Sequence, residues 1–525
     1  MFLCVVFATV MVCRTAAAEN FAGVDDKWRR YESPHFELFS QNADGDSRAL
    51  LRHLEVLSAF FLDLLKLEER QPLEVTIYYF SRHTTFSAYK SAELSKNREI
   101  AAYYLSRPDR AVIAMSSEYG DAETRRIVSH EYIHHLFRIT EEKPTVWFNE
   151  GMAELFSTIE VGSTTLTIGL PIAGHVFRLQ QENLLPLEAL FAVDPRSAIY
   201  TTGEHTGLFY SESWGLLHYL NFGVSDIPAD RLSRFLSYTQ AFGAQADPAA
   251  FREAFNQSFG MDYRQMTKRL DNYFRGGKYF GRRAPLPKTE PPASYPARSV
   301  SRDEIRERLG DLALRVNRSP QGKYALIEAV RKNPVNVRAI EALGTAALVE
   351  GEPEAARERW DEAITAGSTN PAIFYEFAMM EYQRWFRIID PYYRMPEARV
   401  QHLRDVLLRS IKYAPQQYMA YEILAWVEAA AERPAAANVN LVQRMFGKLR
   451  NRQRTILALA LVRLHSNDLA AVDTMLAGLP NAGLEPEIAH ALPGIRAALE
   501  QVRERHAPDD ARPPAAEPAK EKPPG

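Results

Sequence analysis

The run His130-Glu131-Tyr132-Ile133-His134 decides how this chain is interpreted, because it sets two histidines four residues apart with a glutamate between them. Four residues advance a helix by about 400°, so both imidazoles lie on one face and can share a metal ion. Glu131 stands beside them, where its carboxylate can accept a proton from a metal-bound water. The pattern predicts a helix that carries two metal ligands and a general base.

A second helix is predicted from about residue 145 to 158, and it carries Glu150 and Glu154 four residues apart. A carboxylate from this helix would complete the three-ligand set of a catalytic zinc and leave the fourth position for water or substrate. The first helix, from about residue 122 to 138, is apolar on its other faces, which indicates a central, buried helix. An unpaired His or Glu would be costly there, so a metal site is favoured over a chance surface pattern.

Composition limits the other possibilities. The chain has 525 residues, too many for one typical core, so two or three domains are expected. Its 63 basic and 66 acidic residues nearly cancel, which gives no reason to expect a nucleic-acid partner. The cysteines are Cys4 and Cys13 alone. Any metal bound further along the chain must therefore use His and carboxylate ligands.

The first 18 residues are predicted to be a signal peptide. An apolar stretch runs from Met1 to Val12, and Ala16-Ala17-Ala18 forms a small-residue cleavage site. An N-terminal anchor is the alternative, but the stretch is shorter than the roughly 20 residues that a spanning helix needs. No later segment is long and apolar enough to cross a bilayer. The expected product is exported, to the bacterial periplasm or the medium.

The rest of the chain divides by pattern into an α+β domain at 25–282, a Pro-rich linker at 283–298, a helical region at 299–505 and a disordered tail at 506–525. Within the first domain, 35–40 and 73–80 have strand patterns, 48–67 has a helical pattern, and 100–105 with 111–115 should form a hairpin. Asn333-Pro334, Asn370-Pro371 and Ala414-Pro415 recur in the helical region. With the small residues between them, they resemble tetratricopeptide (TPR-like) repeats, which predicts an all-α repeat domain.

Four pieces of the first domain resemble the peptidase MA-like gluzincin metallopeptidases, in a subgroup of bacterial exported proteins. They are Ser33-Pro-His-Phe-Glu-Leu38, His130-Glu-Tyr-Ile-His134, Trp147-Phe-Asn-Glu-Gly-Met-Ala153, and Phe209-Tyr-Ser-Glu-Ser-Trp214 before Leu216-Leu-His-Tyr-Leu220. The resemblance covers about half the chain. It implies a zincin-like α+β fold with Zn²⁺ as cofactor.

The resemblance also implies roles for individual residues. His130, His134 and Glu150 would bind the zinc, Glu131 would be the general base, and Glu154 would accept a hydrogen bond from a ligand imidazole. Tyr210 would stabilise the oxyanion, with Tyr200 as the alternative. The resemblance further implies that an edge strand, here the one carrying Tyr103 and Tyr104, pairs with extended substrate. The remaining histidines near these motifs are expected to be structural: His135, His205 and His218.

The sequence favours an exported zinc metallopeptidase that cleaves protein or peptide substrates, with the repeats recruiting substrate or a protein partner. The gap between His134 and Glu150 is shorter than in aminopeptidase N, and no Gly-x-Met-x-Asn-type exopeptidase signature occurs upstream. An endopeptidase is therefore expected. Two alternatives stay open. The repeats could be the working part of an inactive scaffold, or the metal could assist hydrolysis of a non-peptide bond.

Overall fold

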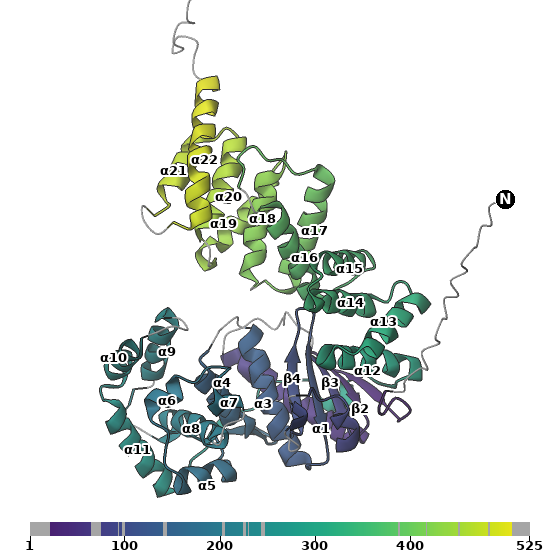
Figure 1. The fold of residues 1–525 in the computed structure, drawn as a ribbon, viewed down its shortest axis with the longest axis vertical. Coiled ribbons are helices and arrows are strands. Elements are labelled where there is room, and N and C mark those ends of the chain that lie inside the picture. Colours follow the sequence, from purple (N-terminus) through teal and green to yellow (C-terminus); the bar gives the residue numbers. More distant parts are fainter. Residues whose placement is uncertain are drawn as a thin grey trace, which may run out of the picture. The chain divides into compact units, whose positions relative to one another are not determined.

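The computed structural model describes residues 21–64, 75–92, 94–96, 100–139, 144–201, 205–223, 227–228, 230–242, 247–386, 389–415, 417–449, 452–480 and 484–506 (Figure 1). The predicted signal peptide and nearly all of the predicted tail lie outside these residues. The described residues form two compact units, one that ends at Glu350 and one that begins at Gly351. In the described part of the chain, no helix combines the length and apolarity that crossing a bilayer requires.

The first unit is mixed α+β and is built on a six-stranded sheet with the order β4-β5-β3-β2-β1-β9. The strands are β1 (Arg29–Glu32), β2 (Phe36–Ser40), β3 (Val75–Phe80), β4 (Ala102–Ser106), β5 (Ala111–Ser116) and β9 (Ala297–Ser299). The central strands β2, β3 and β5 are parallel, and the other neighbours pair antiparallel. β4 and β5 form the predicted hairpin.

Both faces of this sheet are covered, which suits the β-branched and aromatic composition of β3. Ile77 and Tyr79 face a core shared with α1 (Asp44–Leu64) and α3 (Asp121–Ile139). Tyr78 and Phe80 face a second core shared with α12 (Arg302–Asn317). Strand β3 is buried along its whole length. The short helices α2 (His83–Ser87) and η1 (Leu94–Lys96) precede β4.

A helical layer follows the sheet and contains the second predicted helix, α4 (Val146–Ser157). A small sheet of β6 (Glu160–Val161), β7 (Thr165–Ile168) and β8 (Arg282–Pro285) borders this layer. The remaining helices are α5 (Ala173–Gln181), α6 (Leu187–Phe191), α7 (Ala198–Thr201), α8 (Thr206–His218), a π-helical turn at Tyr219–Gly223, α9 (Asp230–Phe242), α10 (Pro248–Phe259) and α11 (Tyr263–Gly276). α4 and α8 pack directly on each other.

The first unit extends past the predicted linker, so the boundary expected at 283–298 is wrong for the described fold. β8 and β9 lie in or beside that segment and pair with β7 and β1. The helices α12, α13 (Pro320–Lys332) and α14 (Val337–Glu350) also belong to this unit. The predicted repeat region at 299–505 therefore contains three helices of the first unit, of which α12 packs on the sheet and α14 forms ion pairs with it.

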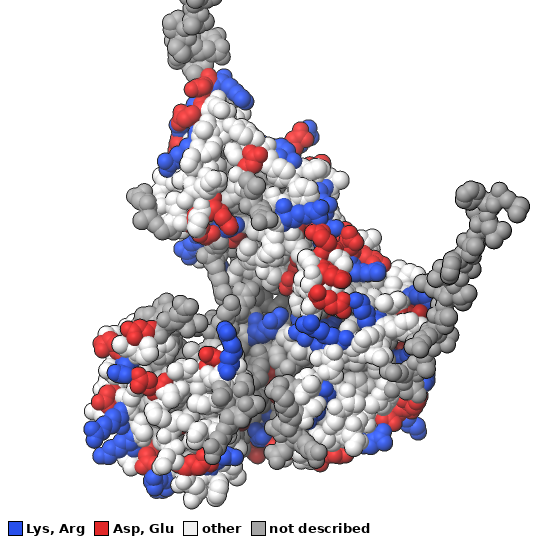
Figure 2. Space-filling model, viewed as in Figure 1, with Lys and Arg blue, Asp and Glu red and all other residues white. Residues whose placement is uncertain are grey.

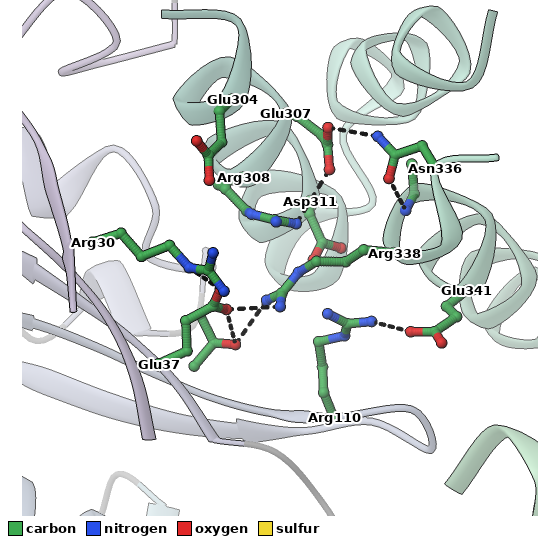
Figure 3. A network of polar contacts seen from close by, with 12 residues as sticks. Arg30, Glu37, Arg110, Glu304, Glu307, Arg308, Asp311, Asn336, Arg338 and Glu341 are labelled. Atoms are coloured by element: carbon green, nitrogen blue, oxygen red, sulfur yellow. Dashed lines mark hydrogen bonds and ion pairs between the residues drawn. The ribbon is translucent and has the colours of Figure 1, made fainter. Parts of the chain in front are cut away.

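Buried charges join these helices to the sheet (Figure 3). Glu37 on β2 is 2% exposed and pairs with Arg30 at 2.6 Å and with Arg338 of α14 at 2.7 Å. Burial opposes its ionisation, but Arg338, Arg308 and Arg30 outweigh burial and lower the pKa of Glu37 to about 2. Arg110 beside β5 pairs with Glu341 of α14 at 2.6 Å. Such pairs are favourable only when well matched, so they fix how the helices lie on the sheet.

The second unit is helical throughout its described residues. Its helices are α15 (Pro353–Thr365), α16 (Pro371–Trp385), α17 (Glu397–Tyr413), α18 (Tyr418–Ala430), α19 (Ala436–Met445), η5 (Phe446–Lys448), α20 (Arg452–His465), α21 (Leu469–Ala477) and α22 (Pro486–His506). α15 to α18 pack each on the next, and α16, α18, α20 and α22 also contact one another in that order. Asn370 caps α16, with Pro371 in its first turn. Stacked neighbours of this kind build an elongated helical array.

Candidate metal centre

Helix α3 holds the His130-to-His134 motif against the sheet. Gly120, with φ +79°, precedes it, and Asp121 and Glu123 lie in its first turn, where acidic side chains favour a helix start. Val128, Tyr132, Ile133 and Leu136 enter the core beneath the sheet. His130, Glu131 and His134 are only partly buried, at positions away from that core. The predicted helix is confirmed, with one residue more at each end.

The three predicted ligands converge on one point. His130 Nε2 and His134 Nε2 are 3.2 Å apart, and Glu150 Oε2 lies 3.5 Å from each of them. Glu150 is 2% exposed, and its Oε2 has no hydrogen-bond partner among the described residues. A buried carboxylate oxygen of this kind needs a counter-charge. His130, His134 and Glu150 form a group that could hold a metal ion.

The position of Glu150 depends on a close approach between α4 and α8. The next residue, Gly151, lies so near α8 that an added Cβ would stand 2.6 Å from the Ser213 carbonyl oxygen and 2.8 Å from Leu217. A larger residue would push the helices apart. The glycine in the predicted Glu150-Gly151 pair therefore lets α4 seat deeply enough for Glu150 to reach the two histidines.

Each ligand imidazole has an oxygen acceptor at its other nitrogen. His130 Nδ1 lies 3.4 Å from Glu154 Oε1, as expected for Glu154, and His134 Nδ1 lies 3.2 Å from Asn149 Oδ1. Partners of this kind leave the Nε2 lone pairs free for a metal and hold the ring planes in place. The sequence reasoning missed Asn149, although it stands next to Glu150.

Glu154 is held by two further nitrogen-bearing side chains. Its Oε2 lies 3.2 Å from His175 Nε2 on α5 and 3.3 Å from Arg126 Nη1 on α3. Burial opposes the ionisation of Glu154, but His130, His175 and Arg126 outweigh burial and lower its pKa to about 2. His175 Nδ1 is in turn 3.0 Å from the hydroxyl of Ser211. His175 was not predicted, and only the tertiary fold brings it here.

The carboxylates surround His130 with negative charge. Burial alone would lower the pKa of His130, but Glu154, Glu150 and Glu131 outweigh it and raise this pKa to about 9. A raised imidazole pKa means that the surroundings favour positive charge at this position. The cluster could therefore hold a cation, either a proton or a metal ion.

The two candidate tyrosines lie together beside Glu150. The Tyr200 hydroxyl donates to Glu150 Oε1 over 2.8 Å. Tyr210 stacks on Tyr200 with ring centroids 6.2 Å apart. Burial, followed by the charge of Glu150, raises the pKa of both phenols, so both stay protonated donors at neutral pH. Tyr200, the predicted alternative, makes the direct contact with a ligand, and Tyr210 lies behind it.

Glu131 is half-buried, and its carboxylate makes no hydrogen bond or ion pair within the described part of the chain. It is close enough to influence the charges of His130 and Tyr200. A carboxylate beside the metal position and not engaged with described neighbours can exchange protons with a bound water.

The other histidines near these motifs lie outside the cluster of His130, His134 and Glu150. His135 is fully buried, contacts the Tyr104 hydroxyl at 3.3 Å, and has its pKa lowered to about 3 by burial. His218 is fully buried between the Tyr273 hydroxyl and the Gly169 carbonyl, each at 2.8 Å. His205 is exposed at the start of α8.

A buried acid on α8 lies outside this hydrogen-bond network. Glu212 Oε2 accepts from the Leu185 backbone N–H over 2.8 Å, while Oε1 has no partner among the described residues. Burial raises the pKa of Glu212 from 4.5 to about 8. Its carboxyl group is therefore neutral in the folded protein at neutral pH.

No protein-family model matches the chain, and no curated protein matches it either. Interpretation of the site therefore depends on the geometry of its own residues.

Proposed function

We propose that the first unit is a zinc-dependent metallopeptidase with a zincin-like fold, in which His130, His134 and Glu150 bind the ion. The observation that carries this is the convergence of two imidazole nitrogens and one orphaned carboxylate oxygen within 3.5 Å. A His₂Glu set with a fourth position left for water is a catalytic type of zinc site.

The spacing of the three atoms supports zinc. Ligands held tetrahedrally at 2.0–2.1 Å from an ion should lie about 3.3–3.4 Å from one another. The observed separations are 3.2, 3.5 and 3.5 Å. Two neutral imidazoles and one carboxylate would leave a net charge of about +1 on the bound ion, which suits a Lewis acid.

When bound, zinc would supply a Lewis acid that polarises a peptide carbonyl and acidifies a water. Glu131 would accept the proton of the attacking water and return it to the leaving amine. The Tyr210 hydroxyl, which stays protonated, would donate a hydrogen bond to the developing oxyanion, while the Tyr200 hydroxyl donates to Glu150. Asn149 and Glu154 would hold the ligand imidazoles in a fixed orientation during turnover.

The edge of the six-stranded sheet supports an extended peptide as substrate. β4 pairs with β5 on one side and has no strand on its other side within the described residues. It packs against α3, and its Tyr104 contacts His135 in the motif helix. A peptide that added to this edge as another strand would lie beside the metal ligands. This favours cleavage within a chain, and hence an endopeptidase.

The second unit gives the scaffold alternative its support, because stacked TPR-like helices present long surfaces to protein partners. We propose that it recruits a protein substrate or an envelope partner of an exported enzyme. A chain that ends at Glu350 separates the two roles, since the first unit ends there.

The test is zinc content measured together with proteolysis of an unfolded protein, on the chain that begins at Glu19. The wild type and Glu131→Gln should each bind one equivalent of zinc, and only the wild type should cleave. His134→Ala should lose both zinc and cleavage. His205→Ala, which changes an exposed histidine in the same unit, is the matched control and should keep both.

The outcomes separate the candidate functions. Zinc bound by both chains without cleavage by either would support a zinc-stabilised scaffold, and the unit from Gly351 onward would then be tested for partners. Cleavage that survives Glu131→Gln would remove the general-base assignment. Absence of zinc from the wild type would reject the ligand set and the mechanism with it.

A further inference from the structure

A group of exposed aromatic and basic side chains lies on the first unit, at the outer side of α5 and β8. Phe177 is 67% exposed and Phe280 is 65% exposed, the highest values among the aromatic residues of the described chain. Lys278, Arg282 and Arg283 are exposed beside Phe280 in the sequence. These five residues are called the basic aromatic patch.

The surroundings of two glycines place the segment that carries Phe280 alongside α5, which carries Phe177. A Cβ at Gly277 would lie 3.7 Å from the Gln180 side chain, near the end of α5. A Cβ at Gly281 would lie 3.4 Å from Leu170, just before α5 begins. The segment between these glycines therefore runs antiparallel along α5, past the turn that carries Phe177.

The middle residue of this segment anchors it. Tyr279 turns inward and packs on Trp214, with ring centroids 5.6 Å apart, and its hydroxyl donates to the Phe274 carbonyl. Because side chains alternate along an extended segment, Lys278 and Phe280 project outward on either side of Tyr279. The patch is thus held on a rigid support and is not a loose loop.

The cations of the patch lack carboxylate partners. Within the described residues, Lys278, Arg282 and Arg283 form no ion pair, although the Arg282 guanidinium lies 5.8 Å from the Phe222 ring. Nearby Arg275 is different, because it pairs with Asp271 at 2.8 Å. Figure 2 shows further Lys and Arg side chains over α11, the helix that leads into the segment. This basic surface belongs to a chain whose net charge is −3.

We propose that the basic aromatic patch docks the protein on the surface of an anionic phospholipid bilayer. Phenylalanines exposed to this degree and flanked by cations match the interface of a membrane, where the rings enter the headgroup boundary and the cations meet lipid phosphates. A soluble polyanion would be recognised by the cations alone and would leave both rings in water. The docking is separate from the metal site, and it holds whether or not the first unit is a peptidase.

The test is co-sedimentation of the chain beginning at Glu19 with vesicles of equal parts phosphatidylcholine and phosphatidylglycerol. Binding should exceed that to phosphatidylcholine vesicles and weaken with added salt. Each patch cation should strengthen vesicle binding about fivefold, so K278E/R282E/R283E should bind the vesicles about a hundredfold more weakly. F177S/F280S should bind about tenfold more weakly.

A matched triple variant controls for net charge. R444E/K448E/R496E reverses three exposed cations of the second unit and should bind as the wild type does. Thermal melts of each variant check folding, and all changed side chains are exposed. Equal binding to both vesicle types, or equal loss in the two triple variants, would overturn the proposal. So would an F177S/F280S variant with undiminished binding, because the two rings would then take no part in the docking.

Discussion

Asp109, in the turn between β4 and β5, is predicted to be a main attachment point of α12, and Asp109→Ala tests this. The carboxylate is completely buried. It accepts two hydrogen bonds from Arg315 of α12, at 2.8 and 2.5 Å, and one from Arg110, at 2.8 Å. Burial alone would raise the pKa of Asp109, but the two guanidinium groups outweigh burial and hold it well below 3.8.

The structure sets the size of the expected loss. Removing one partner of a buried ion pair costs about 3–5 kcal/mol, because the remaining charge stays buried. Arg315 would keep Asp311 at 2.7 Å, and Arg110 would keep Glu341 at 2.6 Å. We therefore expect Asp109→Ala to lower the free energy of unfolding by about 3 kcal/mol, the lower end of that range. Asp109→Asn should cost nearly as much, because the lost charge and not the lost volume is the cause.

The assay is urea unfolding of residues 19–350, followed by the fluorescence of Trp28, Trp147 and Trp214. Asp25→Ala is the matched control, because Asp25 also pairs with α12, through Arg302 at 2.7 Å, but both partners are exposed. That pair should contribute about 0.5 kcal/mol or less. Since the folded pKa of Asp109 is lowered, its stabilisation is present above 3.8 and is lost as the pH falls through the folded pKa. A loss below about 1 kcal/mol, or one equal to that of Asp25→Ala, would refute the reasoning.

Three further predictions follow from the site. Tyr200→Phe removes a hydrogen bond to Glu150, the proposed third ligand, and should weaken zinc binding about 10–100-fold in competition with a chromophoric chelator. Tyr210→Phe should lower turnover and leave zinc affinity unchanged. Equal weakening of zinc binding by both changes would contradict this assignment. Because the folded pKa of Glu212 is raised to about 8, the folded protein binds the extra proton, so stability should fall by up to about 1.4 kcal/mol per pH unit between 4.5 and 8. Glu212→Gln should flatten this part of the stability profile in urea titrations across that range. Gly151→Ala should lower the free energy of unfolding by about 1–3 kcal/mol in thermal or urea unfolding, because its Cβ would meet the backbone of α8. Gly174 has open space around it, so Gly174→Ala should leave stability unchanged. Similar losses in the two variants would show that α4 and α8 are not in close contact at Gly151.

The sequence predicted the parts of the fold that depend on local pattern. The hairpin of β4 and β5, the buried strand β3 and the two motif helices were each expected within a few residues of their bounds. That His130 and His134 share one helix face was also predicted, because residue spacing on a helix is a local property. The approach of Glu150 to them required only that consecutive helices pack, which is the common arrangement.

The boundary between the units was missed for a physical reason. A segment rich in Pro is typical of a linker, but Pro is also tolerated in edge strands, where one side of the backbone needs no partner. Both strands near this segment, β8 and β9, lie at sheet edges. The helices α12 to α14 have the small residues of a repeat. Only the packing of α12 against Tyr78 and Phe80 shows that this helix covers one face of the sheet.

The surroundings of the two ligand histidines differ in a way that the sequence pattern could not indicate. His130 faces a carboxylate, Glu154, whereas His134 faces the neutral amide of Asn149. Glu154 adds a negative charge beside His130, and Arg126, 3.3 Å from Glu154, also pairs with Glu123 at 2.7 Å, so it balances that charge only in part. Under the proposed function, His130 would then be the more strongly donating of the two histidines, because a carboxylate partner raises the basicity of a ligand imidazole more than an amide does.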